Sequence, residues 1–206
     1  MALWARLAER YSDKPWIGGY DLINEPNWDI PGGVKLRELY VEITNAIRAV
    51  DVNHMIIIEG NWFANDYTGL TPPWDSNMAY SGHKYWTYNT QDDLNYMLNI
   101  RENWNVPIWL GETGENSNSW FTGLIELCER NNIGWSWWPV KKAGINNVLQ
   151  VPESQGYENL LSFWKVGYPS VTPDQAFDAV MDWSENHRIE NCEVKRDVID
   201  AMIRQP

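Results

Sequence analysis

The sequence has little cysteine, few basic side chains and no long apolar run. Its two cysteines, Cys128 and Cys192, lack metal-ligand spacing, so they imply neither a disulfide scaffold nor a zinc site. We expect the protein to use no metal and no cofactor. Lys and Arg number 16 against 28 Asp and Glu, which gives a formal net charge of −12. A field of that sign repels phosphate backbones and anionic lipid surfaces, so neither nucleic acid nor a membrane is an expected partner.

Membrane-spanning and targeting segments are also lacking. No apolar run approaches the roughly 20 residues of a transmembrane helix. The first residues, MALWARLAERYSDKPW, mix charged with apolar side chains and show no signal-peptide cleavage pattern. The residues by themselves therefore leave the compartment open.

Aromatic residues are plentiful, but mostly of the kinds that carry a polar atom. The chain has 14 Trp and 10 Tyr against only 4 Phe. Such rings stack on sugars or bases in wet clefts as well as packing in dry cores. Together with the excess of acid, this composition favours a neutral ligand.

Amphipathic helical patterns alternate with short apolar segments along the first two thirds of the chain. Helical spacing occurs at 3–11, 36–50, 94–104 and 121–128. Strand patterns lie between these helices, at 16–24, 55–58, 78–82, 107–111 and 133–137. The alternation predicts an α/β fold with a parallel sheet, open or closed into a barrel. After Pro139 the strand patterns stop, and Thr172 begins a capping box of a later helix.

Polar side chains stand where the predicted strands end. Glu25 and Glu112 each close a strand, and His83 and Tyr85 follow another. In a parallel barrel those ends meet at the active face, so we expect the two carboxylates to face each other across one cleft. A glycosidase uses such a pair, about 5 Å apart in retaining enzymes and wider in inverting ones. His83 and Tyr85 can donate hydrogen bonds to the carboxylates, which separates their pKa values and their roles.

Plainer interpretations of the acidic residues stay open. Glu25 before Pro26 also suits a turn cap. Glu115 and Glu59 compete with Glu112, but the position directly after an apolar strand favours Glu112 over Glu115. We expect Glu59 to line the cleft or to make a structural contact.

Four motifs, in order, resemble those of one enzyme family. They are Ile23-Asn24-Glu25-Pro26, His83-x-Tyr85, Leu110-Gly111-Glu112 and a strand that ends in Trp138. They resemble the fourth, sixth, seventh and eighth strand ends of glycoside hydrolase family 5, the cellulase-type retaining enzymes on a (β/α)8 barrel. The resemblance covers about residues 1–150.

This resemblance implies a role for each matched polar side chain. Glu25 would be the acid/base and Glu112 the nucleophile. Asn24 would hold the 2-hydroxyl of the sugar undergoing cleavage, and His83 and Tyr85 would hydrogen-bond around the two carboxylates.

Several tryptophans are candidate sugar platforms. The resemblance implies that Trp138 lies beneath the same sugar. The family often has a cis peptide after this tryptophan, so we predict a cis Trp138–Pro139 bond. Trp28 and Trp62, together with Trp86 and Trp120, follow strand ends in loops, where exposed rings are candidates for sugar binding.

Eight strands and typically ~250 residues close such a barrel, whereas this sequence predicts five strands. The expected fold is therefore a partial (β/α)8 barrel, about its fourth to eighth strands, with a helical C-terminal extension. We expect a single domain over 1–206, with 1–150 as the C-terminal part of the barrel and 151–206 as final helices. Open strand edges need cover, supplied by a missing N-terminal barrel half or by a homodimer.

The predicted activity is endo-acting hydrolysis of a β-1,4-glucan by double displacement, with a polysaccharide or oligosaccharide as substrate. The alternative is a non-catalytic or degenerate carbohydrate-binding partial barrel that turns nothing over. The resemblance implies a secreted or periplasmic enzyme. The choice among glucan, mannan and xylan stays open, because the shape of the pocket decides it.

Overall fold

The computed structural model describes residues 1–28 and 32–203 of the chain. It divides into two compact units, 1–113 with 124–136 and 114–123 with 137–206. None of the helices in the described ranges is long and apolar enough to cross a membrane.

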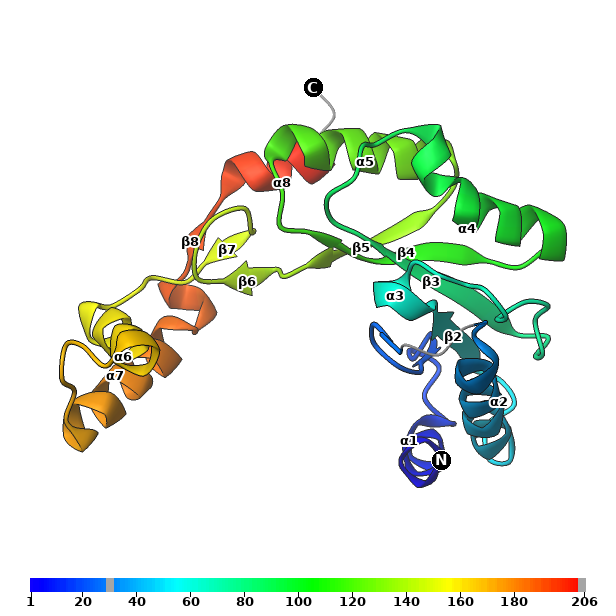
Figure 1. Cartoon of the computed structure of the whole chain (residues 1–206), viewed down its shortest axis with the longest axis horizontal. Helices are drawn as coiled ribbons and strands as arrows, with labels where there is room; N and C mark the ends of the chain where they lie inside the picture. The colour runs from blue at the N-terminus through cyan, green and yellow to red at the C-terminus, as the bar shows by residue number, and fades with distance from the viewer. Residues whose placement is uncertain (29–31, 204–206) are drawn as a thin grey trace. The chain divides into compact units, whose positions relative to one another are not determined.

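The main sheet has five strands that follow one another in chain order (Figure 1). They are β1 (Gly19–Asp21), β2 (Met55–Glu59), β3 (Met78–Lys84), β4 (Ile108–Gly114) and β5 (Gly134–Trp138). The pairs β1–β2, β2–β3 and β3–β4 are parallel. Helices precede and separate the strands: α1 (Ala2–Tyr11), α2 (Val34–Arg48), α3 (Asn61–Ala64), α4 (Gln91–Trp104) and α5 (Asn118–Arg130). This arrangement confirms the predicted partial (β/α)8 barrel.

The strands differ in length from the sequence patterns for reasons of position. β1 comprises three residues where the pattern spans 16–24, because it is first in the sheet and pairs there with β2 alone. β3 has seven residues where the pattern spans 78–82, and all of them are buried. A strand between two neighbours is covered on both edges, so it needs less apolar alternation to form.

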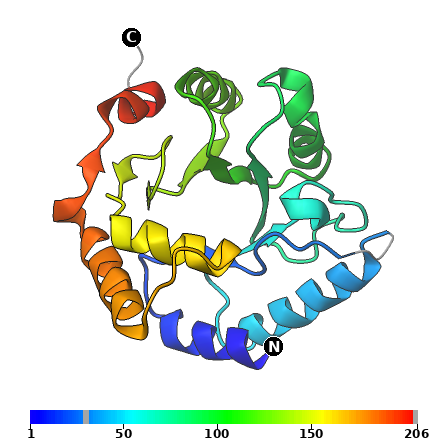
Figure 2. The same ribbon diagram turned by 60° about the vertical axis from the view of Figure 1, so that its left-hand side comes forward.

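The core of the first unit lies between the sheet and the helices. From β2, Ile56 and Ile58 are fully buried. From α2, Tyr40 and Ile47 are buried at helical spacing, and α1 packs beside α2 (Figure 2). Burial of each such side chain contributes roughly 1.5–3 kcal/mol.

The second unit carries a small sheet and four helical segments. Its strands are β6 (Lys141–Lys142), β7 (Leu149–Gln150) and β8 (Glu193–Val194), and its helices are α6 (Gln155–Val166), α7 (Pro173–Asn186), the short 3-10 helix η1 (Ile189–Asn191) and α8 (Arg196–Ile203). α6 and α7 lie side by side (Figure 2), with the rings of Tyr157 and Trp183 stacked 3.9 Å apart. α7 begins with the predicted capping box of Thr172 and Gln175.

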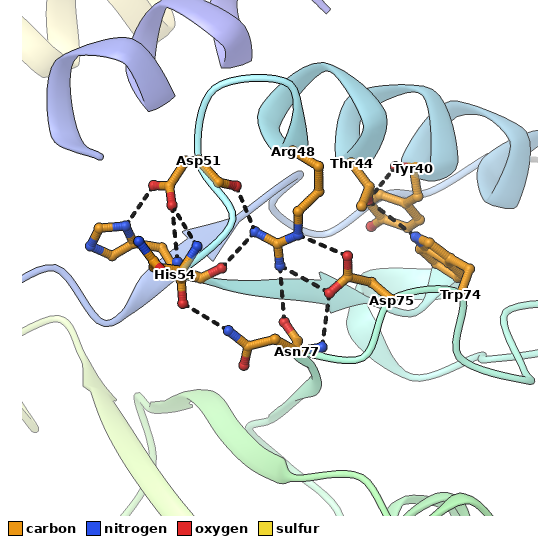
Figure 3. Close-up of polar contacts among 9 residues, drawn as sticks. Tyr40, Thr44, Arg48, Asp51, His54, Trp74, Asp75 and Asn77 are labelled. Atoms are coloured by element: carbon orange, nitrogen blue, oxygen red, sulfur yellow. Dashed lines mark hydrogen bonds and ion pairs between the residues drawn. The ribbon is translucent and has the colours of Figure 1, made fainter. Parts of the chain in front are cut away.

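Arg48, at the end of α2, ties together the segments that lead into β2 and β3 (Figure 3). Its guanidinium makes a bidentate ion pair with Asp75, at 2.8 and 2.9 Å. It also donates to the backbone carbonyls of Asp51, His54 and Asn77. A planar guanidinium suits this bidentate geometry. The acceptors are partly buried, and without Arg48 they would lack a hydrogen-bond donor. These contacts lie at the N-terminal ends of β2 and β3.

Asp51 makes a second polar cluster at the same end of the strands. It accepts from the Tyr20 hydroxyl at 2.6 Å and from the backbone N–H groups of Asn53 and His54, and one of its oxygens lies 2.5 Å from His54 Nδ1. Burial alone would raise the pKa of Asp51, but these hydrogen bonds lower it to about 2. The other His54 nitrogen faces the carbonyl of Lys14, and this contact raises the pKa of His54.

Candidate active site at the strand ends

Carboxyl groups from the ends of three other strands surround the imidazole of His83, at the C-terminal end of β3. Nδ1 of His83 lies 2.8 Å from Glu25 Oε1 and 3.4 Å from Glu112 Oε2, and Nε2 lies 3.2 Å from Glu59 Oε1. His83 is 4 % exposed, while the side chains of Glu25 and Glu112 are 28 % and 17 % exposed. The two outer carboxylates therefore reach solvent and the histidine between them does not.

An irregularity in the β3–β4 pairing brings His83 level with Glu112. Gly82 pairs with Leu110, but the next residue, His83, pairs with Glu112, so β4 carries one extra residue. That residue is Gly111, where a Cβ would lie only 2.1 Å from the hydroxyl oxygen of Ser81. A bulge re-aims side chains at a strand end, and here it sets histidine and carboxylate side by side.

Glu25 reaches the site because β1 has already ended. A strand would place Asn24 and Glu25 on opposite faces, but β1 stops at Asp21 and Glu25 has a left-handed backbone with φ of 45°. Its N–H donates to Glu59 Oε2 at 2.5 Å. Non-glycine residues in this region of φ and ψ are uncommon and often mark functional sites.

The Tyr85 hydroxyl donates to Glu112 Oε2 at 2.5 Å. Glu112 is thus held from two sides, by Tyr85 and by His83. One oxygen of Glu25 and one of Glu112 lie within 4.8 Å of each other and of a ring nitrogen of His83. Three such side chains are also spaced as metal ligands are, and each nitrogen of His83 already lies 2.8 or 3.2 Å from a carboxylate oxygen, of Glu25 or of Glu59.

The charges at this end of the sheet are unbalanced. Burial alone would lower the pKa of His83, but its hydrogen bonds with Glu59 and Glu25 and the charge of Glu112 raise it to about 9. The residue Asp21 of β1 is exposed, yet desolvation of its carboxyl and the charges of Glu59 and Glu112 raise its pKa to about 7. At neutral pH His83 is therefore an imidazolium, and the carboxyl groups of Asp21, Glu25, Glu59 and Glu112 lie around it.

Trp28 and Trp62 lie on neighbouring loops, 44 % and 62 % exposed. The side chain of Asn61 joins these loops, since it accepts from Trp28 N–H at 2.7 Å and donates to the Trp28 carbonyl at 2.8 Å. Trp62 and the next two residues are all left-handed, and this turn also exposes Phe63. Asn24 is exposed on the loop that follows β1.

Trp138 belongs to the second unit. It ends β5 and is 51 % exposed. The prediction of a cis Trp138–Pro139 bond is wrong: the cis bonds of the described residues are Thr71–Pro72 and Tyr168–Pro169. The bond to Pro139 takes the trans form, which X–Pro bonds favour by about 0.5–1 kcal/mol.

Glu115, the rival of Glu112, also belongs to the second unit. Its carboxylate forms an ion pair with Lys142 at 2.6 Å, and its side chain is 47 % exposed. A group already paired with a lysine at the surface is a weaker candidate for the nucleophile than one held by Tyr85 and His83.

The sequence patterns rank Glu59 below Glu112 and do not single out Asp21 or Phe63. Glu59 closes an uninterrupted apolar strand, the same signal that singles out Glu112. Asp21 stands inside a strand pattern, where a lone carboxylate is easily assigned to a solvated face. Phe63 follows Trp62 directly, and only the left-handed turn shows that both rings are exposed.

The geometry agrees with the comparison with known families. The family model for cellulase, glycosyl hydrolase family 5, matches residues 1–144. The chain belongs to glycosyl hydrolase family 5. The motifs and the strand ends that carry the resemblance lie within this matched segment.

Relatives and solved structures extend this result. A beta-xylosidase of Phanerodontia chrysosporium is 25% identical over 77% of this chain and 40% of its own length, and an endoglycoceramidase of Hydra vulgaris is 26% identical over 68% and 31%. The crystal structure of endoglucanase Cel5A from Thermotoga maritima matches with a TM-score of 0.57, at 23% identity over 66% of this chain and 56% of that one. The cellulose synthase subunit Z from Clostridioides difficile matches with a TM-score of 0.63, at 20% identity over 98% and 66%. The chain thus spans less than half the length of these curated relatives.

Proposed function

We propose that this glycosidase cleaves a β-1,4-glucan with retention of configuration, Glu25 acting as the acid/base and Glu112 as the nucleophile. The observation that supports it most is the approach of a Glu25 oxygen to within 4.8 Å of a Glu112 oxygen across one histidine. Retaining enzymes hold their two carboxyl groups about 5–5.5 Å apart, whereas inverting enzymes leave room for a water.

In the first step, Glu112 attacks the anomeric carbon and forms a covalent glycosyl ester. Glu25 gives its proton to the oxygen of the leaving sugar as that bond breaks. In the second step, Glu25 takes a proton from water, which displaces Glu112 and releases the sugar with its original configuration. Tyr85 holds Glu112 in place by a hydrogen bond from its hydroxyl, and Nδ1 of His83 lies 3.4 Å from the same oxygen.

Exposed aromatic rings support a polysaccharide as substrate. Trp28, Trp62 and Phe63 are exposed and follow the C-terminal ends of β1 and β2, as Glu25 follows that of β1. Aromatic faces stack on sugar rings and contribute roughly 0.5–1.5 kcal/mol each. Asn24 and Trp138 belong to the matched motifs and would also bind the sugar.

The experiment is a hydrolysis assay of the chain on glucan, xylan and mannan, with the anomeric configuration of the first product followed by proton NMR. We expect reducing ends from the β-1,4-glucan and a β-anomer as the initial product. An α-anomer would contradict the assignment of Glu112 as nucleophile. Binding of the polymers without release of reducing ends would favour the degenerate carbohydrate-binding protein.

The first three strands of the barrel are the proposed partner of this chain, supplied by a longer polypeptide or replaced by a second copy. Light scattering on the purified chain distinguishes the two. A mass twice that of the 24.0 kDa chain supports the homodimer. A monomer that gains activity when the missing barrel half is supplied supports the longer polypeptide.

A further inference from the structure

Glu59 is a buried carboxylate for which the proposed mechanism has no role. It ends β2 and is 2 % exposed, so it is closed to substrate. Its backbone carbonyl accepts from the hydroxyl of Tyr40, a fully buried residue of α2, at 2.9 Å. A buried carboxylate costs several kcal/mol unless it is paired and hydrogen-bonded, so its partners indicate what it does.

Both partners of Glu59 belong to the candidate site. Oε2 accepts from the backbone N–H of Glu25 at 2.5 Å, and Oε1 faces Nε2 of His83 at 3.2 Å. The first contact fixes the main chain of Glu25 where its φ is 45°. The second fixes the histidine whose opposite nitrogen lies between Glu25 and Glu112.

Only a carboxylate satisfies both partners at once. The N–H of Glu25 is a donor, and Nε2 of a doubly protonated His83 is a second donor, so two acceptor oxygens are required. A glutamine offers one oxygen and one NH2 group. If its oxygen serves Glu25, its NH2 meets Nε2 of His83 and forces that nitrogen to give up its proton.

We propose that Glu59 is a positioning residue, which clamps the main chain of Glu25 and keeps His83 doubly protonated between Glu25 and Glu112. The inference rests on the proposed function for the roles of Glu25 and Glu112, but the contacts that carry it do not. None of the four family motifs includes a residue of β2. In this proposal, Glu59 of β2 fixes the relative position of Glu25 and Glu112.

The charge state of His83 depends on all the groups that face it. These are Glu59 from β2, Glu112 from β4, Glu25 from the loop after β1, and Asp21 from β1. Glu59 is the most buried of the three carboxylates in contact with His83, at 2 % exposure against 28 % for Glu25 and 17 % for Glu112. Solvent screens its charge least, so its removal should lower the proton affinity of His83 more than the loss of Glu25 would.

The chain contains three histidines. The test is NMR of the chain labelled with 15N-histidine. The shifts of Nδ1 and Nε2 report the protonation of each ring directly. In the unaltered chain we expect His83 to be doubly protonated at about pH 7.5, above the ordinary histidine pKa of about 6.5. In Glu59→Gln we expect the midpoint to fall by at least about one pH unit, a tenfold loss of proton affinity. An unchanged midpoint would overturn the proposal.

Two further variants guard this result. Glu42→Gln, the same substitution at an exposed position of α2, should leave the midpoint of His83 unchanged. If Glu59→Gln does not fold, Glu25→Gln decides: with Glu59 present we expect His83 still to be doubly protonated at about pH 7.5. A neutral His83 in Glu25→Gln would show that Glu25, and not Glu59, holds the proton.

Kinetics separate this inference from the proposed function. Because Glu59 is closed to substrate, Glu59→Gln should lower kcat on the order of 100-fold through misplacement of Glu25, with KM little changed. An equal rise in KM would mark Glu59 as a substrate-binding residue and contradict the positioning role. If the unaltered chain hydrolyses no glycan, the proposed function fails, while the NMR midpoint of His83 still decides the role of Glu59.

Discussion

The two ends of strands β2 and β3 use their charges in opposite ways. At the N-terminal end, Arg48 meets one carboxylate, Asp75, and three backbone carbonyls, so cation and anion balance. At the C-terminal end, His83 meets three carboxylates, and the charges do not balance. In parallel barrels the first end serves stability and the second serves activity. The excess of negative charge in one place is a sign of function, because it is costly to the fold.

The largest expected effect is on activity, at the C-terminal end. Glu112→Gln removes the attacking oxygen while keeping the volume of the side chain, so we expect kcat to fall about 10⁴-fold. It also relieves like-charge repulsion, so the free energy of unfolding should rise by about 0.5–1 kcal/mol. Steady-state hydrolysis and urea unfolding measure the two effects.

Glu115→Gln is the matched control for this variant, because Glu115 is the acidic residue next along the chain and is paired with Lys142. We expect its kcat to stay within about twofold of the unaltered chain. Loss of activity in Glu115→Gln and not in Glu112→Gln would exchange the two assignments.

The next effect is on stability, at the N-terminal end. Arg48→Met leaves Asp75 half-buried without its cation and several carbonyls without a donor, so we expect a loss of about 3 kcal/mol in urea unfolding. The midpoint of His83 should not move. Arg6→Met, at an exposed ion pair of α1, is the control and should show no measurable change. An equal loss of unfolding free energy in Arg48→Met and Arg6→Met would show that the contacts of Arg48 contribute no more to stability than an exposed ion pair.

A smaller effect is expected on substrate binding. Trp62→Ala removes an exposed ring beside the site, so we expect KM for a soluble glucan to rise about fivefold with kcat changed less. Trp16→Ala removes a ring that is 93 % exposed and lies before β1, at the other end of the strand. If both variants weaken binding equally, the aromatic loops after β1 and β2 are not a special platform.

A further effect is the dependence of stability on pH. The pKa of Asp51 is lowered to about 2, so its stabilising contribution is present above its ordinary pKa and is lost as the pH falls toward 2. The pKa of His83 is raised to about 9, so its contribution is complete below about pH 6.5 and is lost as the pH rises through 9.

The free energy of unfolding should therefore fall on both sides of neutrality. We expect Asp51→Asn to flatten the acid side and Glu59→Gln to flatten the alkaline side. Urea unfolding between about pH 3 and pH 10 measures both slopes. If the unfolding free energy of Asp51→Asn falls with acid as steeply as that of the unaltered chain, Asp51 does not cause the acid dependence.

The alternation of helices and strands was predictable because hydrophobic periodicity follows directly from burial. The end of β1 was not, because it depends on the left-handed Glu25 and on pairing with β2 alone. Local patterns placed Glu25, His83 and Glu112 at strand ends, and the structure brings them together. The bulge at Gly111 and the burial of Glu59 arise from contacts between strands, and the residue pattern of one strand does not report such contacts.

In the proposed mechanism, Glu112 forms a covalent bond to the sugar. A glycoside carrying fluorine at its 2-position and a reactive leaving group slows the second step more than the first, so the ester accumulates. Intact-mass spectrometry of the treated chain, followed by sequencing of the labelled peptide, should find one sugar, on Glu112, and none in Glu112→Gln. A label on Glu59, Glu115 or another residue, or turnover of the glycoside without any label, would contradict the account.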